Sequence, residues 1–427
     1  MARLLVATVP LTGHVQPMLL VVRGLVARGH HVTWYAASKF RPRIEAAGAT
    51  FAPMQRARDW DDAQIETAFP ALRGKRGLSR VKTQLVEMFI ASMGDQLGDL
   101  EAIAQPAPVD AILADQAHLG AAAFAEKHHV PWIQLAISAL GLPSLDTAPF
   151  GSARRPPRPN EPRWIYRFLN WLIFRIVFRT VNRAYQAERI AAGLSPTRGT
   201  YFEVISPELY LQPTVRSFEY PRRDLPSQVR FIGPLVPRAS SASALPAWWA
   251  DVAAAHAAGT PIVLVTQGTL ATDPQELIAP TLAALAGEPL LVIATTPGHL
   301  DAPANARIAP FIAYQELLPL VSVMVTNGGY GGVQMALSYG VPLVVAGGSE
   351  EKPEIAARVA WSGTGIDLRT GRPNPAALRT AVRRVLDEPA FAARARAIAD
   401  EMSRHDAVRE GIDAIEAVIP ASMRAAS

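Results

Sequence analysis

The stretch LLVATVPLTGHVQPMLLVVRGLVARGHHVTWYA, residues 4–36, decides the fold of this chain. It opens with a short apolar run, and a run with helical periodicity follows from Met18 to Arg28 and stops at Gly29. A second apolar run occupies residues 32–36. Because strand, helix and strand in this order form the unit of a parallel sheet covered by helices, the chain is predicted to open with a doubly wound α/β domain.

The same alternation recurs further along the chain. Apolar runs at residues 111–114 and 132–136 flank a helical stretch at residues 117–127. Beyond a segment rich in proline and serine, a fresh alternating series begins. Its expected strands are residues 262–266, 290–294, 321–325 and 343–345. Two doubly wound domains are therefore expected.

The predicted boundaries follow these changes in composition. The first domain is expected to span residues 1–225 and the second residues 247–405, with a proline-rich linker at residues 226–246. A C-terminal helix and tail are expected at residues 406–427. Within the first domain, residues 164–189 are predicted to form one long helix rich in aromatic and aliphatic side chains.

Composition excludes several classes of protein. Hydrophobic residues make up 49% of the 427 residues and charged residues 19%, which excludes disorder of the whole chain. The net charge of +5 is too small to indicate nucleic-acid binding. The absence of cysteine excludes disulfides, thiolate metal sites and a cysteine nucleophile. With no expected signal peptide, and no apolar stretch of about 18 residues, the protein is expected to be soluble and cytoplasmic.

The loop after the first strand contains a candidate catalytic base. Ligands of open α/β sheets bind at the carboxyl ends of strands, and of the nine histidines only His14 is expected there immediately before a helix. Its imidazole can act as a general base near neutral pH, or it can belong to the start of the helix without chemistry. Asp115 follows the run at residues 111–114. It can orient His14 if both strands lie in one sheet, or it can cap the next helix.

A glycine cluster is the strongest candidate for a phosphate site. The sequence NGGYGGV, residues 327–333, follows an expected strand and opens an expected helix. Its glycines allow close approach of a ligand, and their amides at a helix N-terminus suit a phosphate or diphosphate. The spacing matches neither a Walker motif nor G-x-G-x-x-G, which argues against both kinds of site. A plain tight turn is the alternative.

Weaker candidates lie in other loops. Residues 266–269 follow a strand and can contact a phosphate, and the charged loop at residues 347–354 can bond sugar hydroxyls or simply start a helix. The acidic pattern at residues 59–61 resembles short metal motifs, but helix capping explains it better, and no metal is expected. The arginines of residues 164–189 form a stripe that can contact anionic lipid, although a solvated face is the simpler interpretation.

Taken together, these motifs resemble the family 1 glycosyltransferases with the two-domain GT-B fold, especially bacterial members that glycosylate macrolides, phenolics or lipids. The resemblance covers nearly the whole chain. Its motifs are GHVQPM at residues 13–18, FIGP at 231–234, PFIAYQELL at 310–318, the glycine signature at 325–332 and GVP at 340–342. It implies a UDP- or dTDP-linked sugar on the second domain and a hydrophobic, hydroxyl-bearing acceptor on the first.

The resemblance also implies roles for individual residues. His14 would deprotonate the acceptor hydroxyl, Asp115 would orient and charge-balance His14, and the anomeric carbon would be inverted. The glycine amides would stabilise the leaving diphosphate without a metal, so no cofactor besides the nucleotide sugar is expected. The residues assigned to donor binding are Gly13, Gln267, Gly268, Thr269, Phe311, Gln315, Asn327, Gly328, Gly329, Gly331, Gly332, Glu351 and Lys352.

Some of these positions depart from the family pattern. Asn327 stands where many relatives have a histidine, and Met335 where many have an acidic residue for the ribose hydroxyls. Glu351 and Lys352 stand where many have the Asp-Gln pair that holds the sugar, which leaves the sugar open. Phe311 replaces a tryptophan and keeps base stacking.

Two alternatives to transfer stay open. One is a nucleotide-sugar epimerase of the GT-B fold, against which the acceptor-side motif at residues 13–14 argues. The other is a non-catalytic partner of another transferase, against which the intact pair of His14 and Asp115 argues. Peripheral membrane contact is a further option, and no nucleic-acid partner is expected.

Overall fold

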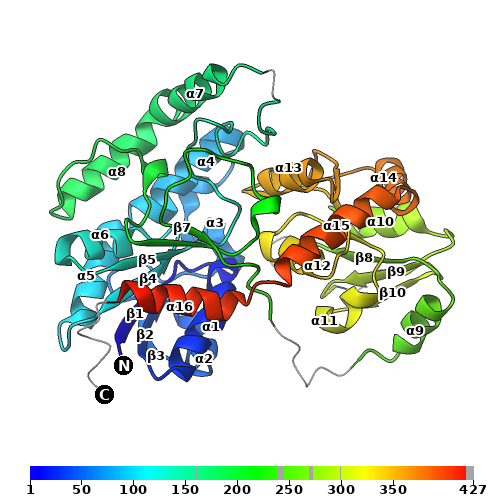
Figure 1. Ribbon diagram of the computed structural model, residues 1–427, viewed down its shortest axis with the longest axis horizontal. Coiled ribbons are helices and arrows are strands. Elements are labelled where there is room, and N and C mark those ends of the chain that lie inside the picture. The colour runs from blue at the N-terminus through cyan, green and yellow to red at the C-terminus, as the bar shows by residue number, and fades with distance from the viewer. Residues whose placement is uncertain (159–160, 238–244, 269–272, 299, 420–427) are drawn as a thin grey trace.

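Two α/β domains lie side by side, each built around a parallel sheet, as the computed structural model shows (Figure 1). The structure describes residues 1–158, 161–237, 245–268, 273–298 and 300–419. Within these residues no helix combines the length and the hydropathy that a bilayer crossing requires.

The first sheet has seven parallel strands in the order β3-β2-β1-β4-β5-β6-β7. The strands are β1 (Arg3–Ala7), β2 (His31–Ala36), β3 (Thr50–Pro53), β4 (Ala111–Asp115), β5 (Trp132–Leu135), β6 (Leu209–Gln212) and β7 (Val229–Phe231). The chain order runs outward in both directions from β1 and β4. The carboxyl ends of these two strands therefore form the topological switch point, where open sheets bind their ligands.

Eight α-helices of the described chain surround this sheet. They are α1 (Thr12–Ala27), α2 (Arg41–Glu45), α3 (Ile65–Ala68), α4 (Gly77–Gln84), α5 (Met93–Ala104), α6 (Leu119–His128), α7 (Trp164–Trp171) and α8 (Arg179–Ala191). The start of α1 lies well before the expected Met18, because the Leu11 carbonyl already accepts from the amides of His14 and Val15. His14 therefore lies in the first turn of a helix rather than in a loop.

The single long helix expected at residues 164–189 is wrong in detail. A π-helical segment at Leu172–Val177 follows α7, and the helix breaks at Phe178 before α8 starts. The Asn182 side chain donates to the Phe174 carbonyl at 2.6 Å, so a side chain satisfies a carbonyl where the helical register changes.

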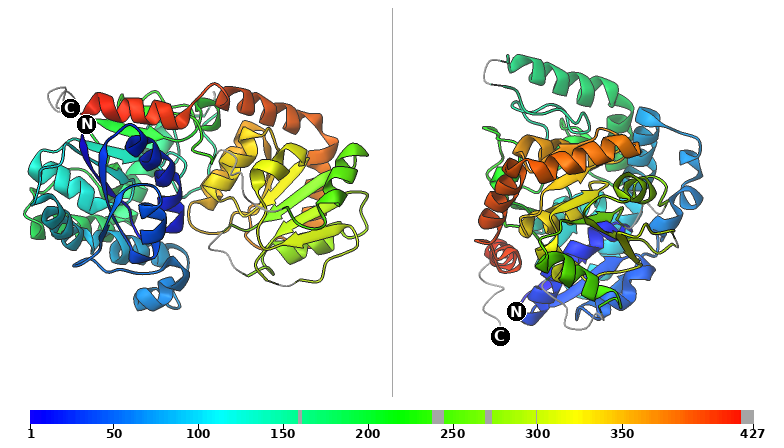
Figure 2. Two further views of the ribbon diagram at one scale, coloured as in Figure 1. Left: turned by 90° about the horizontal axis from the view of Figure 1, so that it is seen from below. Right: turned by 90° about the vertical axis from the view of Figure 1, so that its right-hand side faces the viewer.

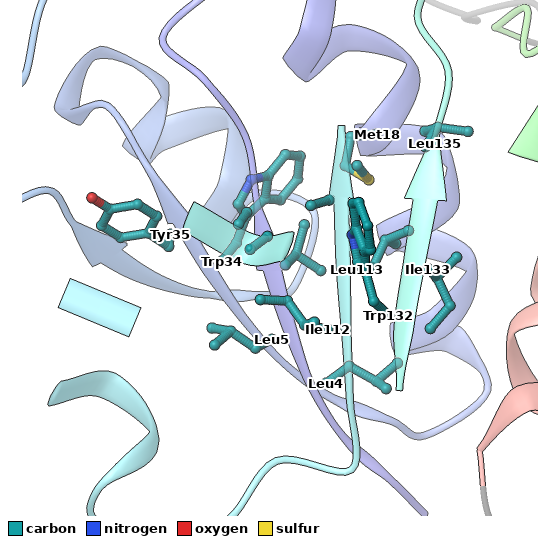
Figure 3. Packing of buried hydrophobic residues seen from close by; sticks show 14 of the residues in the cluster. Leu4, Leu5, Met18, Trp34, Tyr35, Ile112, Leu113, Trp132, Ile133 and Leu135 are labelled. Atoms are coloured by element: carbon teal, nitrogen blue, oxygen red, sulfur yellow. The ribbon is translucent and has the colours of Figure 1, made fainter. Parts of the chain in front are cut away.

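The core of the first domain fills both faces of its sheet. Figure 3 shows Leu5, Trp34, Ile112 and Ile133 from four neighbouring strands, with Met18 from α1 packed over them. All five side chains are buried. A parallel sheet covered on both faces needs strands that are apolar throughout, and this explains the continuous runs that identified β1, β4 and β5 from the sequence.

The second sheet has six parallel strands in the order β10-β9-β8-β11-β12-β13. The strands are β8 (Ile262–Thr266), β9 (Leu291–Thr295), β10 (Ala306–Ala309), β11 (Val323–Thr326), β12 (Leu343–Val345) and β13 (Gly365–Asp367). The helices of this half are α9 (Trp249–Ala257), α10 (Ile278–Leu285), α11 (Tyr314–Leu317), α12 (Tyr330–Ser338), α13 (Lys352–Ser362), α14 (Pro375–Asp387) and α15 (Pro389–Met402), and the chain then continues into α16 (Ala407–Val418). Its switch point lies between β8 and β11.

The domain boundary differs from the expected one at the linker. The linker expected at residues 226–246 contains β7, which pairs with β6 and completes the first sheet. The helix α16 crosses back to the first domain and packs on α1 (Figure 2). Arg28, the C-cap of α1, pairs with both Asp413 and Glu416 at 2.6 Å. The first domain is thus completed by a segment that follows the second.

Candidate active site

The carboxyl ends of β1 and β4 bring His14 and Asp115 together. β1 and β4 are adjacent and in register, with Ala7 opposite Ala114. Asp115 is the last residue of β4, and His14 lies in the first turn of the helix that follows β1. His14 Nδ1 lies 2.9 Å from Asp115 Oδ1, although in this conformation the nitrogen has no hydrogen-bond partner of good geometry. Such contacts are often misaligned until substrate binds.

Asp115 is held by the main chain around it. It is fully buried, and it accepts from the amides of Val9 and Ala117, each at 2.8 Å. Burial raises the pKa of Asp115. The positive charge of His14, the contact with its ring and the hydrogen bond from the Val9 amide lower the pKa by more than burial raises it, so the pKa lies below its ordinary value. A carboxylate therefore faces Nδ1 and leaves Nε2 as the ring nitrogen available to a substrate.

The structure corrects the expectation that His14 is the only histidine between a strand and a helix. His118 is the N-cap of α6, where its Nδ1 accepts from the Ala121 amide at 3.1 Å. Burial lowers the pKa of His118 to about 4. Its Nε2 has no hydrogen-bond partner in the described structure. The predicted helix at residues 117–127 begins two residues before α6, so it places His118 inside the helix instead of at its N-cap.

A residue that the sequence analysis missed positions the first turn of α1. Asp62 is buried, and its Oδ2 accepts from the Thr12 amide at 2.6 Å, while Lys39 pairs with the same carboxylate. The turn that carries His14 is therefore held from a segment far away in the sequence. No local signal could have found this contact, because Asp62 and Thr12 meet only in the tertiary structure.

The acidic pattern at residues 59–61 has structural partners. Asp59 accepts from the Ser38 amide at 3.0 Å, and Asp61 caps the next turn through the Ala63 amide and pairs with Lys39 at 2.8 Å. In the described part of the chain no group of three or more histidine or acidic side chains is arranged to hold a metal ion.

The glycine cluster forms the turn between β11 and α12. Gly328 has φ of 88°, and a Cβ there would lie 2.8 Å from Val345 Cγ1, so only glycine fits. Gly329 caps α12, and Gly331 and Gly332 lie in its first turn, where amides lack partners within the helix. A Cβ at Gly331 would meet nothing within 4 Å. A side of Gly331 therefore faces open space.

The neighbouring loop after β8 is tied to this turn. Asn327 Nδ2 donates to the Gln267 carbonyl, which joins the ends of β8 and β11. The Gln267 side chain is buried and engaged at both ends, with Asp273 at 2.8 Å and the Ile278 amide at 3.1 Å. Its side chain therefore braces the loop that follows β8. Thr269 lies outside the described residues.

Three other residues predicted to bind the donor differ in how accessible they are. The Phe311 side chain is 69% exposed, so its ring is accessible to a stacking partner. Gln315 Nε2 donates to the Pro237 carbonyl at 3.3 Å. Gly13 has open space where a Cβ would be, which leaves room for a ligand beside His14.

The loop before α13 faces the site of the first domain. Glu350 adopts φ of 58° and pairs with Lys352, the first residue of α13. Burial and the charge of Glu350 raise the pKa of Glu351, while the charge of His14 acts in the opposite direction. Glu351 is thus close enough to His14 for their charges to influence each other across the domain boundary.

A buried ionic cluster fixes this boundary. Arg358 of α13 pairs with Glu219 of the first domain at 2.8 Å and with Glu354 at 3.0 Å, and all three are at most 3% exposed. Glu354 also accepts from the amides of Gly151 and Ala153, at 2.8 and 2.7 Å. The pair of Glu354 and Arg358 is local to α13, but their contact with Glu219 could not be found from the sequence, because Glu219 lies far away along the chain.

The comparisons with known proteins extend over both domains. Residues 279–418 match the family model of erythromycin biosynthesis protein CIII-like proteins, C-terminal domain. The chain is 43% identical over 423 residues to 4'-demethylrebeccamycin synthase of Lentzea aerocolonigenes, covering 98% of this chain and 100% of that protein. It is 32% identical over 429 residues to UDP-glucosyltransferase B1 of Starmerella bombicola, covering 96% of each. The solved structure of CalG4, the calicheamicin glycosyltransferase, matches with a TM-score of 0.76 at 21% identity and covers 100% of both chains.

Proposed function

The chain belongs to the family 1, UDP-glycosyltransferase-like enzymes of the GT-B fold, and from this premise we propose that it is an inverting hexosyltransferase. It is a glycosyltransferase with a small-molecule acceptor. We propose that the donor is a UDP- or dTDP-sugar and that the acceptor is a hydrophobic molecule with a free hydroxyl.

One observation carries this proposal. His14 Nδ1 lies 2.9 Å from the buried carboxylate of Asp115 at the switch point of the first sheet. In the proposed reaction, His14 Nε2 takes the proton of the acceptor hydroxyl as its oxygen attacks the anomeric carbon. Asp115 stabilises the imidazolium that forms and keeps the ring in one orientation. The bond from the anomeric carbon to the diphosphate breaks on the opposite face, and the configuration inverts.

The leaving group is proposed to rest on the second domain. The bond that breaks transfers its electron pair to the diphosphate, whose charge grows. The amides of Gly331 and Gly332 in the first turn of α12 suit that charge, and the helix dipole adds to it. Phe311 is free to stack on the base of the nucleotide. Glu351, which has a raised pKa and interacts with His14, is proposed to contact the sugar hydroxyls.

Calorimetry and a transfer assay together test the proposal. UDP-glucose and dTDP-glucose are titrated, without metal, into the wild type, His14→Ala and the control His31→Ala, whose side chain is exposed at the start of β2. We expect all three to bind the same donor. We expect kcat for transfer to phenolic or macrolide acceptors to fall about 10²- to 10⁴-fold only in His14→Ala.

The opposite results identify the alternatives. Interconversion of the donor sugar without acceptor glycosylation would indicate an epimerase. No binding of either nucleotide sugar would overturn the donor assignment and favour a non-catalytic role.

A further inference from the structure

Three large aromatic side chains lie exposed along one face of α7. Trp164, Phe168 and Trp171 are 66%, 51% and 53% exposed, and Ile176 in the π-helical segment is 49% exposed. The spacings of four and three residues place the three rings on one side of the helix. Phe168 and Trp171 stack with ring centroids 6.0 Å apart. This outer face of α7 and of the π-helical segment therefore forms a continuous apolar ridge.

The inner face of the same segment is already occupied. Tyr166 and Phe174 are buried, and the Asn170 amide donates to the carbonyls of Ser144 and Thr147 at 3.0 and 2.8 Å. These bonds prevent the helix from rolling to bury its tryptophans. In Figure 1, α7 and α8 form an arm along the edge of the first domain, away from the second sheet. The ridge thus faces outward on a fixed element.

The charged side chains of the helical segment that carries the ridge are all basic. Residues 163–186 contain five arginines and no acidic residue. Arg163 pairs with Asp146 and Arg175 with Glu203. Arg167, Arg179 and Arg183 have no ion pair with any described residue and are exposed. Residues 151–230 hold 14 basic and 6 acidic residues, so this region carries +8, against −3 for the rest of the chain.

From this geometry we infer that the outer face of α7 and α8 docks on an anionic lipid bilayer. Tryptophan and phenylalanine rings partition into the boundary between headgroups and acyl chains, and arginines beside them pair with lipid phosphates. A second copy of the chain does not fit, because an isologous contact through this face would set arginine against arginine. The inference goes beyond the proposed function and does not depend on it.

Vesicle binding tests the inference with the full chain. The protein is mixed with vesicles of phosphatidylcholine alone, or of phosphatidylcholine and phosphatidylglycerol, and sedimented. We expect binding only to the vesicles with phosphatidylglycerol, with a shift of tryptophan emission to shorter wavelength. A triple change, Trp164→Ser with Phe168→Ser and Trp171→Ser, should abolish sedimentation. Circular dichroism of this variant confirms that it is folded.

A charge variant with a matched control separates docking from the net charge. Arg167→Gln with Arg179→Gln removes two charges from the arm and is expected to weaken vesicle binding about thirty-fold. Arg394→Gln with Arg396→Gln removes two exposed charges from α15 and should leave binding unchanged. Equal loss in both variants, or no binding by the wild type, would overturn the inference. A wild-type dimer that the triple change makes monomeric would also overturn it and assign the ridge to a second copy.

Discussion

At the residue scale, the site depends on how firmly Asp115 is held. Its two oxygens receive the amides of Val9 and Ala117 and face His14 Nδ1. Because main-chain groups on two sides of the site hold the carboxylate, it can orient an imidazole without moving itself. The contact with His14 was accessible from the sequence, since adjacent parallel strands deliver the residues after them to one edge. The hydrogen bond that Asp62 accepts from the Thr12 amide could not be predicted from the sequence, because the two residues meet only in the tertiary structure.

Replacing Asp115 by asparagine should uncouple binding from chemistry. The amide cannot stabilise an imidazolium, and its NH2 group repels either a donor amide or the protonated Nδ1. We expect Asp115→Asn to lower kcat by about two to four orders of magnitude and to leave the dissociation constant of the nucleotide sugar unchanged. Steady-state kinetics and calorimetry measure the two quantities. An unchanged kcat would remove Asp115 from the mechanism.

His118 should make stability depend on pH. Its pKa is about 4 in the folded chain, against 6.5 for an ordinary histidine. Between these values the unfolded chain binds the extra proton, so the free energy of unfolding falls as the pH drops, by up to about 3 kcal/mol. In His118→Asn, which can keep the cap on α6, this part of the slope should vanish. Urea denaturation from pH 7 to pH 4 compares the two proteins, and equal slopes would contradict the assignment.

At the element scale, most central strands were predictable, whereas the edge strands and the buried strand β6 were not. β1, β4, β8 and β12 are buried on both faces and appear in the sequence as continuous apolar runs. The edge strand β10 has only its end residues buried, which leaves no such run. The break at Phe178 escaped prediction because the flanking residues keep helical periodicity. The sequence therefore defines the middle of each sheet, where the sites lie, better than its margins.

Alanine substitutions at two glycines of one turn should distinguish an effect on stability from an effect on donor binding. Gly328 has a positive φ and no room for a Cβ, so Gly328→Ala should lower the free energy of unfolding by about 1–3 kcal/mol and weaken donor binding. Gly331 has open space, so Gly331→Ala should change stability by less than about 0.5 kcal/mol. We expect it still to weaken donor binding, because a methyl group would stand before the diphosphate. Wild-type affinity in Gly331→Ala would contradict the diphosphate site.

At the scale of the whole molecule, contacts between the domains fix how the two proposed sites lie relative to each other. Gln212 of β6 donates to the Tyr330 hydroxyl at the start of α12 at 2.9 Å, and both are buried. The ionic cluster around Arg358 lies at the same boundary. Neither could be predicted from sequence, because a buried arginine looks like any other arginine of an amphipathic helix until its partners are known.

The cluster supports a prediction about domain assembly. Arg358→Met leaves the carboxylates of Glu219 and Glu354 buried without their cation. We expect a loss of about 3–5 kcal/mol in the free energy of unfolding, with a wider range of domain arrangements in X-ray scattering. Adding Glu219→Gln and Glu354→Gln should restore part of that stability. An additive, further loss would show that the three side chains do not act as one unit.

The measurement that tests the central claim most directly compares the wild type and His14→Ala with phenolic acceptors of graded acidity. If His14 removes the acceptor proton, its loss should matter less as the hydroxyl becomes easier to deprotonate. We expect a deficit in kcat of about 10²- to 10⁴-fold for an unsubstituted phenol, which shrinks steadily toward nitrophenols. An equal deficit across the series, or none at all, would contradict the role of His14 as the general base.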